Sequence, residues 1–152
     1  MIIAMPTKTG ILLVIASLAA AGSAIMNVGF SSAMIASLLG AITLSGFLMA
    51  QFSLHGITVS RGRPRDAVCG EAMELPLIAV NRTLFYRMPL VATEKLPFCR
   101  GGKFDTVIPA LAPKSSIRAE RRVIPLKRGH FALDSIFLTG GDPCGLFRKT
   151  RR

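Results

Sequence analysis

Residues 9–54 read TGILLVIASLAAAGSAIMNVGFSSAMIASLLGAITLSGFLMAQFSL, a run of 46 residues without a charged side chain. A helix that crosses a bilayer needs roughly 20 residues at a rise of 1.5 Å each, so two helices and a tight turn fit this run. The apolar sequence is interrupted by residue types that favour turns, namely Asn27, Gly29, Ser31 and Ser32. We therefore predict a turn at Asn27 to Ser32 and two transmembrane helices, over about residues 10–26 and 33–52.

Both predicted helices favour insertion into lipid. Each Leu, Ile, Val or Phe near the centre contributes roughly 0.3–0.6 kcal/mol, and no charged residue imposes the penalty of about 3 kcal/mol. A pair of helices buried in a soluble protein is the alternative, but the polar-rich remainder could hardly cover two helices that are apolar on every face. Small residues recur every four positions and could let the two backbones approach closely: Ala16, Ala20 and Ala24, then Ala33, Ser37, Ala41 and Ser45.

The first apolar segment also has the features of a cleavable signal peptide. Lys8 precedes the apolar core at residues 11–18, and a run of small residues follows at 19–24. The second apolar segment follows almost at once, so cleavage there would leave a mature chain that begins essentially at a membrane helix. We therefore favour a retained hairpin, with a mature chain that starts at or near Met1 rather than at Ile25.

The basic residues predict the orientation of the hairpin. Lys8 is the only charged side chain before Arg61, and Arg61, Arg63 and Arg65 closely follow the second helix. By the positive-inside rule, both ends of the chain and everything after the hairpin lie in the cytoplasm. The same three arginines could also contact anionic lipid headgroups, at about 1 kcal/mol each.

Residues 56–152 are long enough for one small domain. Eight prolines are spread through this part and leave no window for a long amphipathic helix. Short apolar or alternating runs lie at residues 57–59, 75–80, 84–92, 107–111, 117–124 and 131–138, with turn-forming residues between them. We predict an all-β domain, an antiparallel sandwich of the immunoglobulin type with about six or seven short strands.

Several motifs follow one another in an order that resembles a known family. Arg61 and Pro64 follow the hairpin, Gly70-Glu71 come next, and Asn81 ends an apolar strand. Residues 127–131 read KRGHF and residues 142–147 read DPCGLF. This order resembles the N-terminal portion of the bacterial family catalogued as "domain of unknown function 58", and the resemblance covers nearly the whole chain.

Members of that family have two membrane helices, a β-sandwich that closes with an Asp-Pro-Phe-Gly-Leu-Phe motif, and a von Willebrand factor A-like domain. Here Cys144 stands at the usual Phe, Asp134 and Ser135 stand where Gly-Pro is common, and the sequence ends before an A-like domain, where a metal-dependent adhesion site could lie. What the resemblance implies is an adaptor role in an assembly with MoxR-type AAA ATPases and other membrane components.

The two late motifs have sensible structural roles. Gly129 can turn the chain into a strand, the Asp142 side chain can accept backbone N–H groups in a turn, and Leu146 with Phe147 can drop onto the core. The alternative is a partner-binding surface, with an exposed apolar face near residues 142–147 that contacts a second copy or another membrane subunit. The residues of that surface would be Arg128, Gly129, Asp142, Pro143, Gly145, Leu146 and Phe147.

Motifs for catalysis or cofactor binding are missing from the sequence, which contains no GxxxxGK[ST], GxGxxG or HExxH pattern. Cys69, Cys99 and Cys144 are spaced for neither a disulfide framework nor a CxxC metal site. We therefore predict a protein that is not an enzyme and that holds no cofactor or metal.

Two function hypotheses remain. The first is a membrane-anchored adaptor or scaffold that recruits a protein partner. The second is a tethered binder of anionic lipid, nucleic acid or another acidic ligand, because residues 54–152 carry 18 basic and 8 acidic side chains. Aromatic residues are few, so we favour lipid or acidic protein over nucleic acid. Salt separates the two hypotheses, since electrostatic capture weakens steeply with ionic strength.

Overall fold

The computed structural model describes residues 3–26, 30–62, 68–99 and 102–152. Its elements are α1 (Lys8–Met26), α2 (Phe30–Phe52), β1 (Met5–Pro6), β2 (Ile57–Arg61), β3 (Met73–Glu74), β4 (Leu77–Asn81), β5 (Leu90–Lys95), β6 (Lys103–Ile108), β7 (Ser116–Ala119), β8 (Arg122–Val123), β9 (Phe137–Gly141) and β10 (Phe147–Arg151). The chain forms two compact units. Unit 1 comprises Met1–Ser53 and Gly140–Lys149, and unit 2 comprises Leu54–Thr139 and Thr150–Arg152. The predicted helical hairpin followed by a β domain is confirmed.

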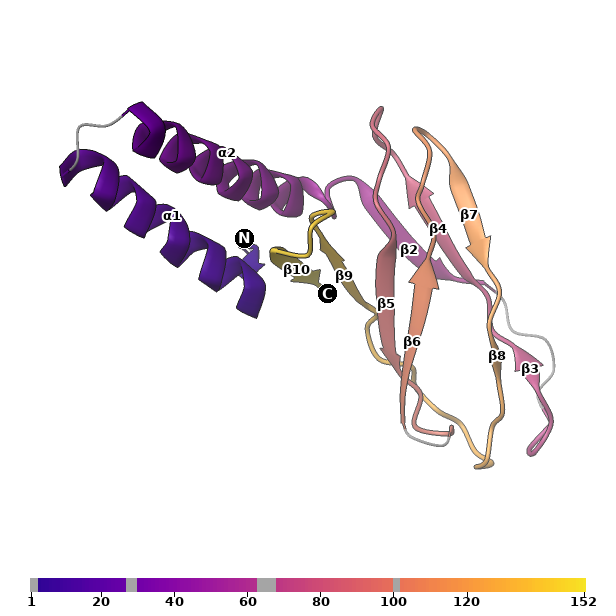
Figure 1. Cartoon of the computed structure of the whole chain (residues 1–152). Helices are drawn as coiled ribbons and strands as arrows, with labels where there is room; N and C mark the ends of the chain where they lie inside the picture. The colour runs from indigo at the N-terminus through magenta and orange to yellow at the C-terminus, as the bar shows by residue number, and fades with distance from the viewer. Residues whose placement is uncertain (1–2, 27–29, 63–67, 100–101) are drawn as a thin grey trace. The chain divides into compact units, whose positions relative to one another are not determined.

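In unit 1, α1 and α2 lie side by side as a hairpin (Figure 1). Their bounds match the predicted segments closely, and both are long and apolar enough to cross a membrane. The predicted turn is partly wrong, because Phe30, Ser31 and Ser32 lie inside α2. The N–H groups of a first helical turn have no partner within the helix, so serine is well tolerated there. The remaining predicted turn residues, 27–29, lie outside the described part of the chain.

The contact face between the helices differs from the predicted one on α2. Ala33, Ser37, Ala41 and Ser45 are exposed. The partly buried positions on α2 instead include Ala36, Leu39, Gly40 and Thr43. On α1, Ala20 and Ala24 are partly buried as predicted, whereas Ala16 is exposed. The Ser17 and Thr43 hydroxyls meet across the interface at 3.1 Å. Small residues occupy more than one face of α2, so spacing alone could not select the face that packs.

Unit 2 is built from antiparallel strands. β4 pairs with β2 on one side and with β7 on the other, and β5 pairs with β6 and β9. A short third pair joins β3 to β8. Alternate residues of β4 are buried because successive side chains of a strand point to opposite faces, so Leu77, Ala79 and Asn81 face inward.

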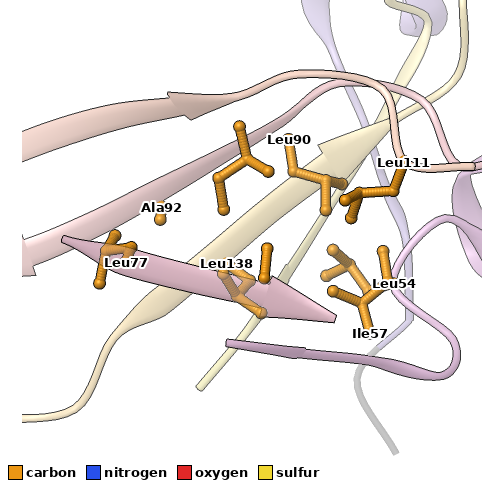
Figure 2. Packing of buried hydrophobic residues seen from close by; sticks show 9 residues of the cluster. Leu54, Ile57, Leu77, Leu90, Ala92, Leu111 and Leu138 are labelled. Carbon is orange, nitrogen blue, oxygen red and sulfur yellow. The ribbon is translucent and has the colours of Figure 1, made fainter. Parts of the chain in front are cut away.

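The two larger sets of strands share one core. Ile57 and Leu77 from one set meet Leu90, Ala92 and Leu138 from the other, and Figure 2 shows these side chains gathered between the strands. A second apolar cluster contains Met73, Leu75, Leu96, Phe98 and Val123. This face-to-face packing fits the predicted sandwich.

Strands overlap all of the predicted runs, but two of these runs lie mostly outside strands. Residues 131–136 belong to no strand, so only the last two residues of the run at 131–138 lie in β9. Residues 84–89 form a loop, and only the end of the predicted run at 84–92 belongs to β5. Pro89 cannot donate a ladder hydrogen bond. Within the loop, Arg87 forms an isolated antiparallel bridge with Leu111, and the Asn81 side chain donates to the Phe85 carbonyl.

Candidate functional site

The Asp142 turn in unit 1 is held by its own carboxylate. Asp142 is buried; its Oδ1 accepts the N–H of Phe147 at 2.6 Å, and its Oδ2 accepts the N–H of Cys144 at 3.0 Å. Gly145 has a φ of +69°, in the left-handed region that glycine adopts without strain. The predicted structural role of Asp142 is therefore confirmed. Pro143, Cys144 and Gly145 are exposed.

The same turn is fixed to the start of α1. The N–H of Thr7 donates to the Leu146 carbonyl at 2.8 Å, and the Thr7 hydroxyl donates to the Gly145 carbonyl at 2.7 Å. Gly10 packs so closely that a Cβ atom at this position would lie 2.0 Å from the Leu146 carbonyl oxygen. Thr7 and Gly10 thus form a clamp with residues 145–146, hereafter the Thr7–Gly10 clamp. Sequence reasoning missed this clamp.

Leu146 and Phe147 are buried between the helices and β1. They form a cluster with Ala4 and Ala50, and the rings of Phe47 and Phe147 meet edge to face with centroids 5.6 Å apart. The expectation that these two residues lie on an exposed apolar face was wrong, because the small side chains of Ala4, Gly46 and Ala50 leave room for them at this end of the helices. The alternative prediction, that both drop back onto a core, is confirmed.

A buried charge cluster lies in unit 2, and sequence reasoning missed its centre. Glu94 is fully buried and pairs through its two oxygens with Arg61 Nε and Arg121 Nη2. Arg121 also donates to the Leu75 carbonyl at 2.8 Å and lies over the Phe104 ring. The signal was present in the strand pattern, since Glu94 continues the inward series of Leu90 and Ala92.

This cluster changes the interpretation of the three arginines after the hairpin. The Arg61 guanidinium bonds to Glu94 and to the Asp134 carbonyl, so its main contacts are inside unit 2 rather than with lipid headgroups. Arg63 and Arg65 lie outside the described residues. The headgroup contact predicted for those two stays a prediction.

Arg128 and Gly129 border a cleft in unit 2 with a volume of about 430 Å³. Its floor is apolar and includes Met73, Leu75 and Phe98, while Lys127 and Arg128 stand at its exposed edge. The rings of Phe98 and Phe131 pack with centroids 5.6 Å apart. Gly129 has a φ of +140°, which fits a turn, but the strand predicted to begin at Phe131 is absent, since residues 131–136 belong to no strand. We call this the Arg128 cleft. It belongs to unit 2, whereas the Asp142 turn belongs to unit 1.

The described residues contain no group of three or more His, Cys, Asp or Glu side chains that could hold a metal ion. All three cysteines are free thiols. Burial raises the pKa of the Cys99 thiol, with Arg121 acting in the opposite direction, whereas Cys144 is exposed.

Comparison with known proteins does not extend this picture. No protein-family model matches the chain, and a sequence search finds no significant match among curated proteins.

Proposed function

We propose that this protein is a membrane-anchored, non-enzymatic adaptor that holds an immunoglobulin-type β domain on the cytoplasmic side of a bacterial inner membrane. The exposure of the helices supports the anchoring. Only Gly10 is buried in α1, and only Gly46 and Ala50 are buried in α2, so most of the large apolar side chains of both helices face outward. In water this surface would be unfavourable at about 25 cal/mol per Å², and a bilayer removes the cost.

The Thr7–Gly10 clamp is the observation that carries the adaptor proposal. Because the clamp holds Leu146 within unit 1, the chain passes between the units near Ser53, Thr139 and Lys149 rather than through one linker. Several covalent crossings restrict the motion of a domain more than a single flexible linker does. A domain held in this way loses less entropy when it binds a partner.

The proposed partner is a protein segment that carries acidic groups and an apolar side chain. The Arg128 cleft supports this chemistry, because its floor is apolar and its edge bears Lys127 and Arg128. The resemblance to the "domain of unknown function 58" family adds a candidate assembly, one that contains a MoxR-type AAA ATPase and other membrane subunits. In such an assembly the Arg128 cleft binds the partner, and the Asp142 turn anchors the chain within unit 1.

Co-purification from native membranes in mild detergent tests the adaptor proposal. The wild-type chain should bring down a defined partner, and Lys127→Glu with Arg128→Glu should weaken that association by reversing the charge at the cleft. Lys95→Glu is the matched control, because Lys95 is exposed on β5 and does not line the cleft. A well-folded monomer without any partner would contradict the adaptor function.

A second candidate function is the binding of an anionic ligand. It is favoured by another cleft in unit 2, of about 410 Å³, whose lining includes Arg61, Arg151 and Arg152. Binding through these arginines should fall steeply between low and physiological ionic strength, whereas a complex formed mainly through the apolar floor of the Arg128 cleft should persist. A salt titration of the isolated complex therefore separates the two functions.

A further inference from the structure

The loop between β4 and β5 presents large apolar side chains to solvent. Leu84, Phe85, Tyr86 and Met88 are 68%, 72%, 76% and 48% exposed. We call residues 84–88 the apolar loop. Single exposed apolar residues are common on proteins, but neighbouring ones on one loop mark a surface that contacts something apolar.

The backbone of the apolar loop is held by hydrogen bonds. Asn81 is fully buried at its base, and its Nδ2 donates to the carbonyls of Phe85 and Ala112, each at 2.9 Å. The Asn81 Oδ1 accepts the N–H of Thr83 at 3.0 Å and the Thr83 hydroxyl at 2.7 Å. The side-chain amide of Asn81 therefore uses both its nitrogen as a donor and its oxygen as an acceptor. These bonds fix the backbone that carries the exposed side chains.

The base of this loop is bonded to the segment that directly follows α2 in the chain. The N–H of Arg82 donates to the Gly56 carbonyl at 2.9 Å. Gly56 follows Phe52, the last residue of α2, by only four residues, and four residues span at most about 14 Å of extended chain. The base of the loop is therefore hydrogen-bonded to a residue that closely follows the second predicted transmembrane helix in the chain.

The charge around the apolar loop suits an anionic lipid surface. Arg82 and Lys114 are exposed beside it, and the N–H of Lys114 donates to the Thr83 carbonyl at 3.0 Å. Residues 75–93 contain no acidic side chain. Tyr86 is the only tyrosine of a chain without tryptophan. Aromatic side chains beside basic ones are typical of the boundary between membrane and water.

We propose that the apolar loop inserts into the headgroup boundary of the same bilayer that α1 and α2 span. This inference rests on the proposed membrane anchoring. Leu84, Phe85, Tyr86 and Met88 enter the boundary, while Arg82 and Lys114 meet lipid phosphates. Contact through this loop adds a non-covalent tether to the chain crossings and further restricts the orientation of unit 2.

Tryptophan fluorescence tests the proposal without background, because the natural chain has no tryptophan. Three variants of the full chain, Phe85→Trp, Lys95→Trp and Leu18→Trp, are reconstituted into phosphatidylcholine–phosphatidylglycerol vesicles with and without brominated lipid. Lys95 is an exposed control at the other end of β5 from the apolar loop, about 17 Å from Leu90 along the strand. Leu18 reports on the span of α1 itself.

We expect brominated lipid to quench the tryptophans at positions 18 and 85 roughly twofold and to leave the tryptophan at position 95 unaffected. Position 85 should be quenched because interfacial side chains reach about 5–10 Å into the headgroup boundary. Quenching at position 18 with none at position 85 would overturn the loop contact and leave the anchoring intact. The absence of quenching at position 18 would instead refute the anchoring. Emission from position 85 that is blue-shifted but not quenched would show that protein covers the loop, and would also overturn the proposal.

Discussion

Gly10 and Gly22 lie on the same helix in different surroundings. A Cβ atom at position 10 would lie 2.0 Å from the Leu146 carbonyl oxygen, whereas nothing lies within 4 Å of one at position 22. The Thr7–Gly10 clamp thus depends on the lack of a side chain at one position of α1. Most of the other apolar residues of α1 are not involved in this close approach.

Gly10→Ala should therefore open the clamp and lower the free energy of unfolding by about 1–3 kcal/mol, as overpacking does elsewhere. Gly22→Ala is the matched control and should be neutral or stabilising by up to about 1 kcal/mol, because alanine favours a helix. Thermal unfolding in mild detergent measures both, and trypsin should cleave the Gly10→Ala variant faster at Arg148. Equal behaviour of the two variants would show that the clamp contributes nothing to stability.

Glu94 is the residue on which the charges inside unit 2 depend. Glu94→Gln leaves Arg121 buried without its counter-charge and should lower the free energy of unfolding by about 3–5 kcal/mol. Glu94→Leu together with Arg121→Met should recover much of that loss, since an apolar replacement of both partners removes the need for desolvated charges. Glu120→Gln, an exposed control, should stay within about 0.5 kcal/mol of the wild type.

Thermal or denaturant unfolding of the full chain in detergent measures these variants. If Glu94→Gln matched the control, the ion pairs of Arg61 and Arg121 would not support the fold.

At the scale of elements, the start of α2 and the chain end after β10 report on the orientation of the hairpin. Ser31 is exposed in the first turn of α2. In a chain whose three cysteines are replaced by serine, Ser31→Cys should react with a membrane-impermeant maleimide from outside the cell. A reporter fused after Arg152 should behave as cytosolic. If the cysteine at position 31 were protected from the maleimide and the reporter lay outside the cell, the orientation would be opposite to the proposed one.

For the whole molecule, the N-terminal segment is part of the packed structure. Ala4 lies in the cluster with Leu146 and Phe147, and its N–H donates to Gln51 Oε1 at 3.0 Å. Cleavage after residue 24 would remove Ala4 and the Thr7–Gly10 clamp and expose Phe147. We therefore expect intact-mass spectrometry of the protein from membranes to find a chain that starts at or near Met1. A start at Ile25 would mean that the first segment is a signal peptide.

Patterns in the sequence predicted the main elements but not the packing between distant segments. The uncharged run and its length located α1 and α2 within a few residues, since helix length and apolarity are local properties. Strand positions followed from alternation only in part. Residues 131–136 lie in no strand, and residues 84–89 form a loop in which the Phe85 carbonyl accepts a hydrogen bond from the Asn81 side chain. The face of α2 that meets α1 was missed because small residues occupy several faces.

By itself, the sequence determined that two apolar helices precede a β domain, and that Asp142 closes a turn through its backbone neighbours. The tertiary structure alone decided that Glu94 would pair with Arg61 and Arg121, and that Leu146 would be held by Thr7 and Gly10. The physical reason is sequence separation. Hydrophobic period and turn chemistry act over a few residues, whereas Thr7 and Leu146 lie 139 positions apart. Such pairs are specified only when the folded backbone brings their complementary groups together.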